Sequence, residues 1–148
     1  MHEISHRVGI KASVEKIYQA LTTNEGLTQW WTNDVSGAGA VGSIIKFRFN
    51  GGGPDFKVTE LEPNKTVRWQ HSGNMPEAWV NTEISFQLST DGVQTFVRFS
   101  HTNWQECSDF MAHCSTKWAV FLLSLKGAME TNQGKPFPND ISIDTLNF

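Results

Sequence analysis

The chain has 148 residues, of which 39% are hydrophobic and 18% charged, and its net charge is −3 at neutral pH. This length predicts a single domain over residues 1–148, and the composition excludes a disordered chain, which would combine low hydrophobicity with high net charge. Lys and Arg are scattered along an acidic chain, which argues against nucleic-acid binding. There is no membrane-spanning apolar run and no signal peptide, so we expect a cytoplasmic protein without membrane insertion.

The N-terminal third predicts one strand and two short helices. Apolar residues alternate over residues 3–10, as in a strand with one buried face. Ser13 can cap a first helix, and Thr23 or Asn24 can start a second that runs to Trp30-Trp31. The glycine-rich stretch 37–42 matches a dinucleotide-binding pattern but precedes a strand instead of a helix, so we read it as a loop and predict no cofactor.

The middle of the chain alternates apolar and polar residues between turn sequences. We predict strands at 45–49, 56–61, 67–71, 79–88 and 94–101. The turns are short, which favours antiparallel pairing.

The last predicted element is a long helix over residues 109–132. Its apolar stripe steps by three or four residues, through Phe110, Cys114, Trp118, Phe121 and Leu125. Gly134, followed by Pro136 and Pro138, predicts its end.

Together these elements predict an α+β helix-grip fold. In it, a curved antiparallel sheet of about six or seven strands wraps around the C-terminal helix, with two short helices after the first strand. A straight helix cannot fill a concave sheet at both ends, so we expect a gap between them.

The local motifs resemble the family of the activator of the 90-kDa heat-shock protein ATPase, in its C-terminal-domain-like branch of the SRPBCC (START-like) superfamily. The resemblance rests on segment 10–21, Trp30-Trp31, the glycine-led strand 42–47, segment 58–69, the strand 95–101 and the final helix with its Gly134-Lys135-Pro136 tail. It implies the helix-grip fold and allows a ligand carrier, an enzyme or a chaperone regulator. Lys117 departs from the family, which often has Gly before the helix tryptophan. The chain also has no room for the separate N-terminal chaperone-binding domain of the eukaryotic activator.

Three histidines, His6, His71 and His101, fall on the apolar faces of their strands. A single inward histidine is usually a hydrogen-bonded core residue, whereas three indicate a partly polar cavity. They could line the cavity, act as catalytic bases near neutral pH, or bind metal if they met. We predict no metal site, and we regard the three as catalytic candidates only.

The abundant aromatic rings extend this interpretation. We predict binding of a small hydrophobic or amphipathic ligand, rather than catalysis, between sheet and helix. The predicted ligand-binding residues are Phe47, Phe49, Trp69, His71, Phe86, Phe99, His101, Phe110, Trp118 and Phe121. Two alternatives stay open: a cyclase- or hydrolase-type enzyme that uses a cavity histidine, and a chaperone-regulating or protein-interaction module.

Four tryptophans fall near predicted loops: Trp30, Trp31, Trp79 and Trp104. Exposed rings of this kind mark partner surfaces, so we expect any protein partner to bind there. Cys107 and Cys114 are too far apart along a helix for a disulfide, and we expect free thiols.

Overall fold

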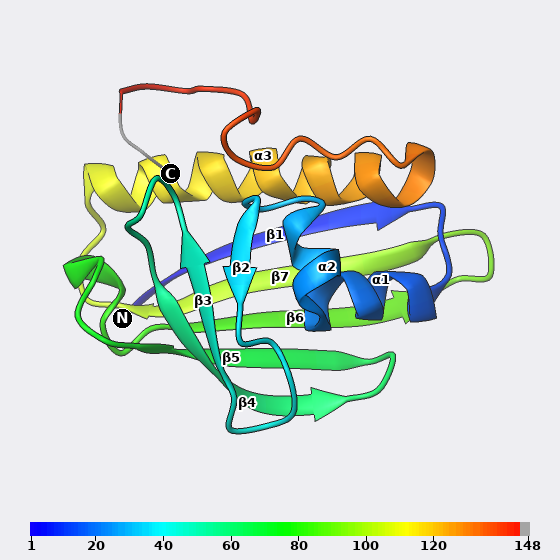
Figure 1. Ribbon diagram of the computed structural model, residues 1–148, viewed down its shortest axis with the longest axis horizontal. Coiled ribbons are helices and arrows are strands. Elements are labelled where there is room, and N and C mark those ends of the chain that lie inside the picture. The colour runs from blue at the N-terminus through cyan, green and yellow to red at the C-terminus, as the bar shows by residue number, and fades with distance from the viewer. Residues whose placement is uncertain (146–148) are drawn as a thin grey trace.

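The computed structural model describes residues 1–145 and consists of one antiparallel sheet, two short helices and one long helix (Figure 1). Its strands are β1 (His2–Ile10), β2 (Asp34–Ser36), β3 (Ile44–Arg48), β4 (Asp55–Glu62), β5 (Thr66–Ser72), β6 (Glu83–Thr90) and β7 (Thr95–Trp104). Its helices are α1 (Val14–Thr22), α2 (Asn24–Thr28), the short 3-10 helix η1 (Glu77–Trp79) and α3 (Asp109–Thr131).

The seven strands follow the order β1-β7-β6-β5-β4-β3-β2, and each neighbouring pair is antiparallel. Strands β2 to β7 form a meander. The last strand, β7, pairs with the first, β1, which lies at the edge of the sheet. The two short helices lie in front of the sheet, and α3 runs along its upper border (Figure 1). This arrangement confirms the predicted helix-grip fold.

The pairing register places the apolar side chains on one face. Trp69 is opposite Ile84, and Phe86 is opposite Phe99, all four fully buried or nearly so. Because directly opposite residues share a face in an antiparallel pair, these rings meet in one layer under α3. The strand faces predicted from the sequence are therefore confirmed.

Helix α3 begins at a capped N-terminus and carries two buried stripes. The Ser108 hydroxyl accepts a hydrogen bond from the backbone N–H of Met111 at 3.2 Å. The predicted apolar stripe packs on the sheet, whereas His113, Lys117 and Ser124 form a second, polar stripe that is also buried. This polar stripe is covered by the C-terminal tail, residues 132–145, which runs back along α3 (Figure 1).

Two local predictions were wrong, and one short strand was missed. Residues 79–82 are not strand, because the backbone N–H of Val80 bonds Glu77 in η1 and the Thr82 hydroxyl bonds the Trp79 carbonyl at 2.6 Å. Helix α3 ends at Asn132, a C-cap in the left-handed conformation (φ 58°), and not at Gly134. The three-residue strand β2 was not predicted, since so short a segment carries no clear alternation.

The expectation of an exposed tryptophan surface is also wrong. Trp30, Trp31, Trp79 and Trp104 are between 0% and 3% exposed. Their loops fold inward, and the rings join the core; Trp31, for example, lies 4.1 Å from Phe47 and 4.8 Å from Trp118 between ring centroids. A partner surface built from these four rings is therefore excluded in this conformation.

Candidate functional site

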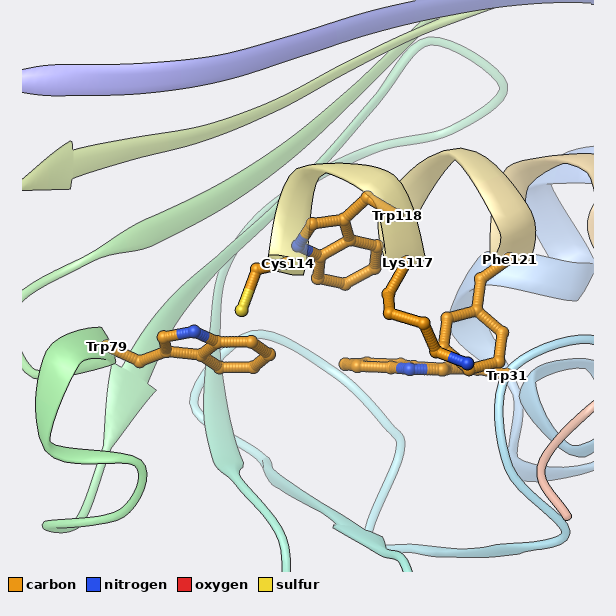
Figure 2. Close-up of a pocket in the computed structure, with 6 residues that line it drawn as sticks. All are labelled: Trp31, Trp79, Cys114, Lys117, Trp118 and Phe121. Carbon is orange, nitrogen blue, oxygen red and sulfur yellow. The ribbon is translucent and has the colours of Figure 1, made fainter. Parts of the chain in front are cut away.

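A small cavity lies against the middle of α3, between this helix, Trp31 in the loop after α2 and Trp79 in η1. Its volume is about 10 Å³, and it is lined by Trp31, Trp79, Cys114, Lys117, Trp118 and Phe121 (Figure 2). A volume near 10–15 Å³ holds about one water molecule. Aromatic rings therefore nearly fill the space beside α3.

Lys117 places a cation at the wall of this cavity. Its ammonium group lies 5.0 Å from the centre of the Phe121 ring, and both side chains extend from α3 (Figure 2). It donates hydrogen bonds to the Asp140 carboxylate and to the Ile141 carbonyl, the latter at 3.0 Å. The side chains of Lys117 and Asp140 are 8% and 7% exposed, so this ion pair is buried.

His101 belongs to a hydrogen-bonded chain behind the cavity. The Trp118 indole donates to its Nδ1 at 3.2 Å, and its Nε2 lies 2.9 Å from the Thr82 hydroxyl. An indole nitrogen can only donate, so the ring proton of His101 is on Nε2 and is donated to Thr82. Burial, with a smaller effect of His71, lowers the pKa of His101 from 6.5 to about 3. His101 is therefore neutral at physiological pH, and both its ring nitrogens are engaged.

Cys114 contributes a thiol to the same cavity. Burial raises the pKa of Cys114 from 9.0 to about 12, against a smaller lowering effect of the nearby Trp79 indole. Cys114 is thus a neutral, unreactive wall residue, whereas Cys107 is exposed. Both cysteines are free thiols, as predicted.

The other two candidate histidines lie apart from one another. His71 bonds the Met75 carbonyl through Nε2 at 2.9 Å, and its buried Nδ1 has no hydrogen-bond partner among residues 1–145. Burial is the main cause that lowers the pKa of His71. His6 lies at the other edge of the sheet core, with its Nε2 3.0 Å from the Ser115 carbonyl and its ring stacked on Phe99. Trp79 separates His71 from His101, and within residues 1–145 no three potential metal ligands come together.

Of the ten residues predicted to bind a ligand, Trp118 and Phe121 line the cavity. The other eight form the surrounding core or its edge, namely Phe47, Phe49, Trp69, His71, Phe86, Phe99, His101 and Phe110. Sequence reasoning missed Trp31, Trp79, Cys114 and Lys117 as lining residues. The signal for Lys117 was its position directly before the helix tryptophan, where the family often has Gly.

A family model described as "Activator of Hsp90 ATPase homolog 1-like protein" matches residues 11–130. The chain belongs to this family. The assignment confirms the resemblance found in the sequence, and the match runs from the residue after β1 to the last turn of α3. No curated protein matches the sequence.

Solved structures of related proteins agree with the family. The solution structure of the Aha1 dimer from Colwellia psychrerythraea is 75% identical, with a TM-score of 0.85 over 90% of this chain and 100% of that one. A Staphylococcus saprophyticus protein is 15% identical (TM-score 0.75; 90% of this chain, 95% of that one). A Mesorhizobium loti protein is 22% identical (TM-score 0.75; 84% and 94%). The last two likenesses establish the fold alone.

The fold alone does not choose between ligand binding, catalysis and regulation of another protein. Within the part of the chain that the structure describes, no helix is long and apolar enough to cross a membrane.

Proposed function

We propose that this chain binds a small amphipathic molecule between the sheet and α3, in a state in which the aromatic cavity widens. The observation that carries the proposal is the buried cation of Lys117 at the wall of an otherwise aromatic cavity. Burying a charge costs free energy, and a core built only for stability does better with an apolar residue. Ligand sites, in contrast, combine apolar walls with a few placed polar groups.

The segment between β5 and β6 is the natural route of opening. It carries Trp79 on its inner side, and its other residues Pro76, Glu77, Ala78 and Val80 help to line a surface groove of about 720 Å³. This segment has no strand pairing between Ser72 and Glu83, apart from the backbone bond between His71 and Thr82. An outward turn of Trp79 would join the cavity to the groove and admit a ligand.

The six tryptophans provide the test. Naphthalene-2-methanol, a neutral apolar alcohol, is titrated into ¹⁵N-labelled protein while the indole N–H signals are recorded by NMR. Binding in the cavity shifts the signals of Trp31, Trp79 and Trp118 most. The signal of Trp30 moves less, because its N–H bonds the Ala20 carbonyl at 2.9 Å on the far side of the cluster. Unmoved signals, or a shift of Trp104 alone at the groove, would contradict the proposal.

A second candidate function is regulation of an Hsp90-type ATPase. It is supported by the description of the family and by the name of the Colwellia psychrerythraea relative. The test is the ATPase rate of a purified Hsp90-family chaperone with and without this chain, with an unrelated acidic protein as control. An unchanged rate, with no complex on size-exclusion chromatography, counts against this function.

A further inference from the structure

The anion that compensates Lys117 comes from neither the sheet nor α3. It is the carboxylate of Asp140, which lies in the C-terminal tail. The tail has no helix or regular strand between residues 132 and 145, and it runs antiparallel to α3. Its successive contacts on the helix are Ser124, Lys117 and His113.

The first half of the tail is firmly anchored. The backbone N–H of Lys135 bonds the Ser124 hydroxyl at 2.7 Å, and Phe137 exchanges backbone hydrogen bonds with Trp31 and Asn33. The Phe137 ring also packs on Phe49 at 5.2 Å. Leaving this position would cost both apolar contact and backbone hydrogen bonds.

The second half, residues 139–145, is held differently. Its hydrogen bonds and ion pairs with α3 join Asp140 and the Ile141 carbonyl to Lys117, and Asp144 to His113 at 2.7 Å. Of its two isoleucines, Ile141 is 61% exposed and Ile143 is only partly buried, so neither is part of the buried core. Segments with few apolar contacts open at low free-energy cost, so this half can detach while Phe137 stays in place.

Detachment leaves the Lys117 ammonium without its carboxylate, next to Trp31, Phe121 and the cavity. A buried ammonium requires a compensating anion. A ligand with a carboxylate at one end and an apolar body at the other meets both needs: its charge replaces Asp140, and its body enters the space between Trp31, Trp79 and Trp118.

We infer that Asp140 occupies the anion position of the ligand site, and that the ligand is a small amphipathic monocarboxylate which displaces residues 139–145 from Lys117. This inference rests on the proposed function and names the ligand class and the internal competitor. Only molecules in which Asp140 has left Lys117 can bind such a ligand. The apparent affinity is therefore the intrinsic affinity multiplied by the fraction of molecules in that open state.

Two matched probes separate charge from apolar binding: naphthalene-2-carboxylate and the neutral naphthalene-2-methanol. Dissociation constants are measured by calorimetry for the full chain and for its variants, with circular dichroism as a check of folding. The dissociation constant of the alcohol divided by that of the carboxylate measures the preference for the anion. In Asp140→Asn this ratio rises by about tenfold or more, because the internal competitor is gone.

Lys117→Met abolishes the preference, and so does the double variant Lys117→Met/Asp140→Asn, which contains neither buried charge and guards against misfolding of the single variant. Asp144→Asn is the comparison variant: it weakens the contact of the same tail with His113 but keeps the Asp140 carboxylate, so the ratio rises less than in Asp140→Asn. Equal affinity for both probes in the parent and in Asp140→Asn would overturn the anion site while leaving cavity binding intact. Failure of both probes to bind any folded variant would overturn the proposed function itself.

Discussion

Trp118 on α3 donates its indole N–H to Nδ1 of His101 on β7, which links the long helix to the sheet by a buried hydrogen bond of 3.2 Å. The chain of hydrogen bonds continues through Thr82 to the Trp79 carbonyl, so it connects α3, β7 and the segment between η1 and β6. Such a chain stabilises one arrangement of the rings around the cavity, because each member would be unsatisfied without its neighbour.

Trp118→Phe tests this link. The variant keeps an aromatic ring but leaves Nδ1 of His101 as a buried acceptor without a donor, at a cost of about 1–3 kcal/mol. Trp104→Phe is the matched control, because Trp104 is equally buried and its Nε1 has no hydrogen-bond partner within residues 1–145. Urea unfolding should show that Trp118→Phe lowers the free energy of unfolding by about 1–3 kcal/mol more than Trp104→Phe does. Equal losses would mean that the bond adds no stability.

Stability should fall as the pH drops below about 6.5. The folded-state pKa of His101 is about 3 and that of His71 is also lowered, mainly through burial, against an unfolded value of 6.5. Below pH 6.5 the unfolded chain binds more protons, so the free energy of unfolding decreases by up to about 1.4 kcal/mol per pH unit for each histidine.

Urea unfolding between pH 5 and 7 measures this slope, in a range where carboxylates remain mostly ionised. His101→Gln should flatten the curve relative to the parent protein. A parent stability that is constant or rises on acidification in this range would contradict the buried, neutral state of His101.

Removing only Asp140 from the buried Lys117–Asp140 pair should cost more stability than removing both charges. Asp140→Ala leaves a buried ammonium with only the Ile141 carbonyl, and we expect a loss of as much as ~3 kcal/mol. Adding Lys117→Met should restore most of that loss, because it removes the uncompensated charge and keeps an apolar stem near Phe121. Thermal or urea unfolding of the three proteins checks this, and additive losses in the double variant would contradict it.

Gly134 positions the start of the tail by its lack of a side chain. A Cβ there would come within 2.0 Å of the Gln29 carbonyl oxygen, a backbone atom that cannot yield easily. Gly134→Ala should therefore destabilise the protein by more than about 1 kcal/mol. Gly52→Ala, where nothing lies within 4 Å of the added Cβ, should change the free energy of unfolding by less than about 0.5 kcal/mol. Similar losses in both variants would contradict the close approach.

The two thiols should differ in reactivity. Cys107 is exposed, whereas Cys114 is buried with its pKa raised to about 12, so only Cys107 should react quickly with iodoacetamide at pH 8. Cys114 should react slowly, at a rate set by opening of the cavity, and faster in Asp140→Asn. Mass spectrometry after timed labelling distinguishes the two sites. Rapid labelling of Cys114 in the parent would mean that the cavity is open.

Periodicity was sufficient to predict the fold because each strand face and the apolar stripe of α3 repeat a simple pattern over many residues. It failed where a local hydrogen bond decides the backbone, as in the bond of Thr82 to Trp79 that turns the predicted strand start into η1. It also failed for side chains buried by a distant segment. Lys117 is covered only because the tail returns along α3, and a pattern within the helix contains no information about that contact.

A crystal structure of the protein with naphthalene-2-carboxylate would show whether the ligand displaces the tail. We expect the naphthalene ring between Trp31, Trp79 and Trp118, its carboxylate at the Lys117 ammonium, and Asp140 displaced. A cavity unchanged from its present 10 Å³, with the probe absent or bound only in the groove beside Pro76 and Phe110, would contradict this expectation.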